Sequence, residues 1–135
     1  MIVIDACVAV KWFLPEPQSD LAEAVLMEDE VRIAPEHVLV EVGNTLLGAH
    51  RANAITLDHA RAAISALEKL IQLRPIHEIA DAALQIASVI GCTHYDALYV
   101  AAAGRWDAAL VTADARLVRQ LQAAPWNGAV RLLGA

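Results

Sequence analysis

Short, almost uniformly apolar runs alternate along the chain with longer stretches in which apolar residues recur every three or four positions. Apolar runs without period-two alternation are typical of parallel strands buried on both faces, whereas the longer stretches predict helices. The predicted strands are 2–4, 31–34, 73–76, 109–112 and 130–133, and the predicted helices are 6–14, 19–28, 36–50, 57–71, 79–90, 95–105 and 115–123. Because crossover helices cover both faces of a parallel sheet, this alternation predicts a three-layer α/β/α domain with a mainly parallel central sheet of about five strands.

The breaks in this pattern are short turns near Pro15, Pro35, Pro75 and Pro125. No repeat, low-complexity tract or linker rich in Gly and Ser separates one part of the chain from another. A chain of 135 residues is long enough to build one core of its own. We therefore expect residues 1–135 to form a single domain.

Hydrophobic residues make up 58% of the chain, but much of this share is alanine. Charged and amide side chains interrupt every apolar stretch before it reaches the roughly 20 residues that a membrane-spanning helix needs. Asp5 falls inside the first apolar run and no positive region precedes it, which does not fit a secretion signal. Two cysteines, Cys7 and Cys92, predict neither a disulfide framework nor a zinc site. We expect a cytoplasmic protein without a membrane segment.

The net charge of −6 argues against a general nucleic-acid-binding protein, which normally carries a basic face. Aromatic residues make up only 4% of the chain, too few for a platform that stacks several bases in a row. Any contact with nucleic acid must therefore be local.

Two acidic residues follow predicted strands directly. Asp5 comes after the first strand, and Asp114 lies two residues past the fourth. In open α/β sheets the ligand-binding crevice lies beyond the carboxyl ends of the strands. We expect both side chains to face one cleft.

Two further acids lie on predicted helices. Glu41 shares a narrow polar stripe with His37, Asn44 and Thr45 on a helix that is otherwise largely apolar, so the stripe is expected to line a cleft. Asp96 lies in the first turn of a helix for which Thr93 is a plausible N-cap.

Each acid has an ordinary structural explanation when taken alone, as a helix cap, a first-turn acid or a solvated side chain. Their joint placement in a β/α architecture favours a shared role, because three of the four are expected at one end of the sheet. Neighbouring carboxylates repel, and a divalent cation compensates for that repulsion. Mg²⁺ and Mn²⁺ prefer such oxygen ligands and leave positions open for phosphate oxygens, which predicts metal-assisted phosphodiester hydrolysis.

With these residues in view, the sequence resembles the PIN-domain family and, within it, the VapC-like toxins. The resemblance covers essentially the whole chain and is carried by four segments in matching order and spacing: residues 3–12, 34–44, 95–99 and 110–114. It implies that Asp5, Glu41, Asp96 and Asp114 bind Mg²⁺ or Mn²⁺ and form the catalytic site. It also implies supporting roles for Thr112 and Asn44 beside the ligands.

The same resemblance implies a function. Toxins of this kind are endoribonucleases that cut transfer or ribosomal RNA, and each is held inactive by a cognate VapB-like antitoxin. They are usually homodimers, and they reach promoter DNA only through the DNA-binding part of the antitoxin.

One position departs from the family pattern. Cys7 stands where the family usually has Ser or Thr two residues after the first Asp, and a thiol is a poorer hydrogen-bonding partner and a softer ligand. Reduced activity or a shifted metal preference is therefore expected. Basic side chains near the matched segments are the candidates for phosphate contacts, with Lys11 and Arg116 first and Arg105 and Arg119 after them.

Two other functions fit the sequence less well than a nuclease. A PIN-like binding or scaffold protein with a weakened or inactive site is suggested only by Cys7, and retention of all four acids speaks against it. A phosphotransfer domain would need a second Asp near Asp5 and a lysine late in the sheet, but the only lysines are Lys11 and Lys69.

Overall fold

The computed structural model describes all of residues 1–135, and its five strands form one fully parallel sheet in the order β3-β2-β1-β4-β5. The strands are β1 (Ile2–Ile4), β2 (Arg32–Pro35), β3 (Gln72–Arg74), β4 (Ala109–Thr112) and β5 (Val130–Leu132). The α-helices are α1 (Ala6–Ala9), α2 (Ser19–Leu26), α3 (Val38–Arg51), α4 (Leu57–Leu70), α5 (Ala80–Ile90), α6 (His94–Arg105) and α7 (Ala115–Gln122). Two short 3₁₀ helices, η1 (Val10–Trp12) and η2 (Ile76–Glu78), complete the chain.

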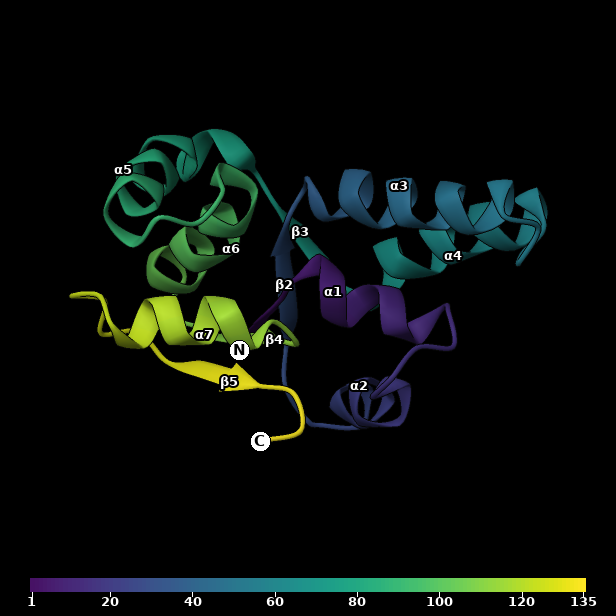
Figure 1. Cartoon of the computed structure of the whole chain (residues 1–135), viewed down its shortest axis with the longest axis horizontal. Coiled ribbons are helices and arrows are strands. Elements are labelled where there is room, and N and C mark those ends of the chain that lie inside the picture. Colours follow the sequence, from purple (N-terminus) through teal and green to yellow (C-terminus); the bar gives the residue numbers. More distant parts are fainter.

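The helices lie in two layers with the sheet between them, which confirms the predicted α/β/α class. Figure 1 shows α5, α6 and α7 on one side of the strands and α1 to α4 on the other. Right-handed crossovers require this division, because the chain moves outward from β1 to β3 and then returns past β1 to β4 and β5. The strand order therefore reverses between β1 and β4, which is where sheets of this class open a crevice.

Helix α6 is the centre of the packing. Every residue from Ala97 to Ala103 is buried, and the helix contacts β1, β2 and β4 as well as α5. A helix that is apolar around its whole girth must be covered on all sides, and its alanines allow the sheet to approach closely. The first turn of α6 is therefore held rigidly at the edge of the sheet where the crevice opens.

Most predicted elements differ from those observed by one or two residues at an end, and two of the differences have a proline beside them as their cause. The helix predicted over 6–14 divides into α1 and η1, because the residue before Pro15 disfavours helical backbone and the last turn tightens to i→i+3 bonds. The strand predicted over 73–76 lies one residue earlier and ends at Arg74, because Pro75 has no N–H to give to the ladder. No helix has the length and apolarity that crossing a membrane requires.

Candidate active site

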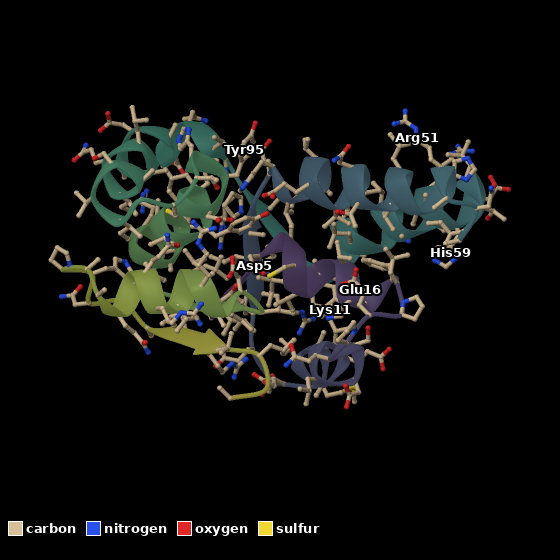
Figure 2. The ribbon with its side chains drawn as sticks, in the orientation of Figure 1. Asp5, Lys11, Glu16, Arg51, His59 and Tyr95 are labelled. Atoms are coloured by element: carbon tan, nitrogen blue, oxygen red, sulfur yellow. The ribbon has the colours of Figure 1, made fainter.

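Asp5 ends β1 and caps α1, so its side chain has both of the positions that the sequence suggested. Its backbone N–H donates to the carbonyl of Val111 on β4 (3.4 Å), and its Oδ1 accepts from the N–H of Val8 (3.1 Å) and from Cys7 Sγ (2.9 Å). Figure 2 places Asp5 between the two groups of helices. The pKa of Asp5 is raised from 3.8 to about 6. Burial is the main cause and the charge of Asp96 acts in the same direction, while the hydrogen bonds of the side chain act against them.

Asp114 occupies the corresponding place after β4. Its Oδ1 accepts from the N–H groups of Arg116 (2.9 Å) and Leu117 (3.2 Å) and so caps α7. Its own N–H donates to Thr112 Oγ1 (3.1 Å). The fully buried Thr112 thus holds the backbone of the turn at Asp114.

Cys7 connects the two strand ends. Its Sγ donates to Asp5, accepts from the N–H of Ala113 (3.3 Å) and lies 3.6 Å from Thr112 Oγ1. Burial and then the charge of Asp5 raise the pKa of the thiol, so it stays protonated and can act as a donor. The thiol therefore makes the contacts expected of a hydroxyl at this position.

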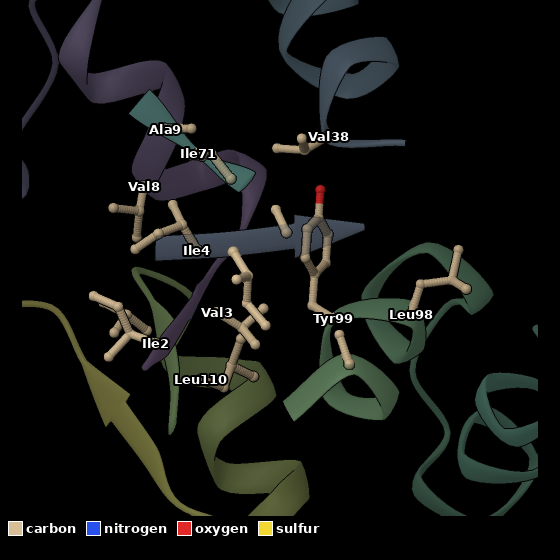
Figure 3. Close-up of a cluster of buried hydrophobic side chains, with 14 of the residues drawn as sticks. Ile2, Val3, Ile4, Val8, Ala9, Val38, Ile71, Leu98, Tyr99 and Leu110 are labelled. Carbon is tan, nitrogen blue, oxygen red and sulfur yellow. The ribbon is translucent and has the colours of Figure 1, made fainter. Parts of the chain in front are cut away.

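Glu41 reaches the same edge from α3. Its Oε1 accepts from the hydroxyl of Tyr99 on α6 (2.8 Å) and lies 3.1 Å from His37 Nε2. Burial alone would raise the pKa of Glu41, but these two contacts lower it overall. Figure 3 shows the Tyr99 ring rising from α6 with its hydroxyl directed toward Val38, at the beginning of α3.

Asp96 lies between the other acids. The N-cap predicted at Thr93 is confirmed, because its hydroxyl accepts from the N–H of Asp96 (3.1 Å). Burial raises the pKa of Asp96 first, and the charges of Asp114 and Glu41 raise it next. The charge of Asp96 in turn raises the pKa of Asp5, so Asp96 interacts electrostatically with each of the other three acids.

Three of these carboxylates are anchored in the same way. In Asp5, Asp114 and Glu41, two protein groups lie within hydrogen-bonding distance of the same carboxylate oxygen, Oδ1 or Oε1. A carboxylate held through one oxygen keeps its orientation and retains lone pairs for another ligand.

These residues suit a hard divalent cation in their chemistry. The oxygen donors favour one, and so does the repulsion from Asp114 and Glu41 that adds to burial in raising the pKa of Asp96. No three side chains of His, Cys, Asp or Glu close around one point, so the compact cage expected from the sequence is not observed. Mg²⁺ keeps several waters and is commonly bound through one or two carboxylates, so an open arrangement of this kind still fits it.

A polar cleft of about 400 Å³ adjoins the acids. Its lining includes Cys7, Lys11, Glu16, Glu41, Asn44 and Thr45. Lys11 thus lies in the cleft, but its Nζ is 3.4 Å from Glu16 and donates to the carbonyl of Pro17 (2.8 Å). Asn44 is exposed on the polar stripe of α3, as the sequence suggested.

The other basic candidates are placed less favourably. Arg116 is exposed in the first turn of α7, next to Asp114. Arg105 lies 4.0 Å from Glu78 and covers the ring of Trp106. His94, two residues before Asp96, has its Nε2 3.3 Å from the carbonyl oxygen of Ala80.

Tyr99 belongs to the site although the sequence pattern does not single it out. It is buried, but its hydroxyl is committed to Glu41. One signal was present: Tyr99 follows Asp96 by three residues, so both lie on the same face of α6. Its partner Glu41 is 58 residues away, and no local pattern identifies such a contact.

Comparison with known proteins identifies the family of the chain. The PIN-domain family matches residues 2–121. Ribonuclease VapC1 from Mycobacterium tuberculosis is 34% identical over 117 residues, which cover 85% of this chain and 86% of that protein. The fold is similar to that of VapC20 from M. tuberculosis, a toxin that cleaves the sarcin-ricin loop, with a TM-score of 0.73 and 15% identity over 88% of this chain and 94% of that one. It is also similar to the fold in a toxin–antitoxin complex from Klebsiella pneumoniae, with a TM-score of 0.60 and 16% identity over 84% of this chain and 87% of that one. The chain therefore belongs to the PIN-domain family.

Proposed function

We propose that this chain is a metal-dependent endoribonuclease and the toxin of a VapBC-type toxin–antitoxin pair. The observation that carries the proposal is the set of four carboxylates at the reversal point of the sheet, three of them anchored through one oxygen. Similarity to Ribonuclease VapC1 over most of both chains supports RNA as the substrate.

Asp5, Glu41, Asp96 and Asp114 would hold Mg²⁺ or Mn²⁺. A bound ion of this kind supplies Lewis acidity for phosphodiester hydrolysis, by activating a water and stabilising the leaving oxygen. The protein contributes orientation: Tyr99 and His37 fix Glu41, while Cys7 and Thr112 fix the ends of β1 and β4. No side chain is needed as a covalent nucleophile.

The contacts of Cys7 favour an active enzyme over an inactive scaffold. A half-buried, protonated thiol that donates to Asp5 and accepts from Ala113 does what a serine hydroxyl could do there. The weaker S–H donor is expected to lower activity without abolishing it.

The partners follow from the proposed toxin role. A VapB-like antitoxin would inhibit the chain and carry any contact with promoter DNA, and the similar fold in a toxin–antitoxin complex supports such a partner. The substrate would be a single-stranded loop of transfer or ribosomal RNA, and the protein would act in the cytoplasm as a single-domain homodimer.

Substitution of Asp5→Asn and Asp96→Asn tests the proposal directly. Purified wild-type protein should cleave RNA with Mg²⁺ or Mn²⁺, and its expression without the antitoxin should arrest growth, whereas both variants should lose both effects while keeping the wild-type circular dichroism spectrum. Full activity in both variants would remove the metal-site assignment.

A further inference from the structure

Three aromatic rings form a column between α6 and the beginning of α3. The ring of His37 lies 4.4 Å from that of Tyr99 and 6.4 Å from that of Tyr95, measured between centroids, and the planes of His37 and Tyr95 are 26° apart. His37 Nε2 also lies 3.0 Å from the carbonyl oxygen of Tyr95. The column therefore fixes the backbone of Tyr95 as well as packing beside its ring.

Exposure increases sharply along this column. Tyr99 is 1% exposed, His37 7% and Tyr95 63%. The five other Phe, Trp and Tyr side chains are all buried or half-buried. Tyr95 is thus the one such ring that the fold holds at the surface, and it immediately precedes Asp96. Figure 2 shows it beside the beginning of α3, above Asp5 in that view.

The negative charge of the protein leaves few favourable contacts for the phosphates of an RNA. The chain has a net charge of −6, the acidic site repels a phosphate backbone, and Lys11 in the adjoining cleft already contacts Glu16. A substrate that gains little from phosphate contacts needs another source of affinity. Unpaired RNA bases obtain it by stacking on exposed aromatic rings, a contact that requires no positive charge.

We propose that the exposed face of Tyr95 is a stacking site for one unpaired nucleobase next to the acidic site. This inference rests on the proposed function and adds a substrate contact to it. One base, rather than a run of bases, is expected because no second exposed ring adjoins Tyr95. Stacking on a ring face tolerates any base, so Tyr95 would contribute affinity and favour single-stranded loops over duplex RNA.

Steady-state cleavage of a short single-stranded RNA tests this with three variants of the full chain. Tyr95→Ala should raise KM by about tenfold, because losing one base–aromatic stack weakens binding by this order. Its kcat should change much less. Tyr95→Phe, which keeps the ring, should restore the wild-type KM. Leu84→Ala removes a similarly exposed apolar side chain from α5 and serves as the matched control, with no expected change.

A second measurement does not depend on cleavage. RNA that carries 2-aminopurine should lose fluorescence when it binds wild-type protein or Tyr95→Phe in EDTA, and should keep it with Tyr95→Ala. If wild-type protein cleaves RNA but Tyr95→Ala shows unchanged KM and quenching, the stacking site is wrong and the nuclease stands. A loss confined to kcat would also overturn it, since the ring would then act through His37 and Glu41. Tyr95-dependent quenching without any cleavage would support the stacking site and refute the nuclease.

Discussion

Helix α3 borders two hollows of similar size whose linings are of opposite character. Between α3 and α4 lies a groove of about 470 Å³ lined largely by aliphatic side chains, among them Leu46, Leu57 and Ile64. On another side of α3, the cleft of about 400 Å³ beside the acids is lined by Glu41, Asn44 and other polar residues. Volume does not distinguish the two.

What separates them is the way in which polar atoms are held. The groove between α3 and α4 offers apolar contact area and contains no carboxylate. The polar cleft contains Glu41, whose Oε1 is held by two donors from different elements. Oriented charge, rather than hollow space, marks the site of chemistry.

The strongest test of this comparison changes one residue on each side of α3. Glu41→Gln removes a charge from the acidic set, and RNA cleavage should fall by about 100-fold or more, since even outer partners of metal ligands are worth up to that factor. Leu47→Ala, in the apolar groove, should change cleavage by no more than about twofold, as expected for a surface substitution. Equal losses in initial-rate assays would show that the two hollows are not functionally distinct.

Loss of the hydrogen bond that supports Glu41 should lower RNA cleavage less than loss of the Glu41 charge itself. Tyr99→Phe removes the 2.8 Å hydrogen bond but keeps the ring in the core, so kcat should fall by about tenfold with little change in KM. The unfolding free energy should drop by only about 1 kcal/mol.

Trp12→Phe is a matched control for the loss of a hydrogen bond. Trp12 Nε1 donates to the carbonyl of Ala22 (2.8 Å), and neither partner of this bond is one of the four acids. A similar loss of stability with unchanged kcat is expected, and a tenfold loss of kcat in both variants would show that Tyr99 acts only through stability.

The sequence predicted most of the framework because the framework is local. Apolar runs and helical periodicity gave every strand and α-helix, and the position of Asp5 and Asp114 after their strands followed from parallel topology. The contact between Tyr99 and Glu41 joins α6 to α3 and depends on how the two helices cross beside the sheet. Side-chain anchoring of this kind depends on tertiary packing, which no periodic pattern encodes.

The pH dependence of stability separates the two sides of α3 in another way. Burial raises the pKa of Asp5 from 3.8 to about 6, so the folded protein binds this proton more tightly than the unfolded chain does. Tighter binding of this proton adds to the free energy of unfolding. The full addition is present below about pH 4 and is lost as the pH rises through about 6. Asp5→Asn has no charge to desolvate, so without metal it should be more stable than wild type at pH 7 by up to about 3 kcal/mol.

Urea titrations at several pH values measure this difference. The advantage of Asp5→Asn should shrink toward pH 4, while Leu47→Ala should follow the wild-type pH profile throughout. A variant that is destabilised equally at all pH values would contradict a raised pKa for Asp5.

Added metal should stabilise the protein only through the polar side of α3. An ion that binds only the folded protein stabilises it by mass action, by about 2.7 kcal/mol at a hundredfold excess over Kd, and should relieve the repulsion that raises the pKa of Asp96. Millimolar Mg²⁺ or Mn²⁺ should therefore raise the Tm of wild type and of Leu47→Ala by several degrees, but that of Asp96→Asn much less. Differential scanning fluorimetry with and without EDTA measures the shift. Equal Tm shifts in all three proteins would place the ion away from the carboxylates, because an ion bound elsewhere would not lose affinity when the charge of Asp96 is removed.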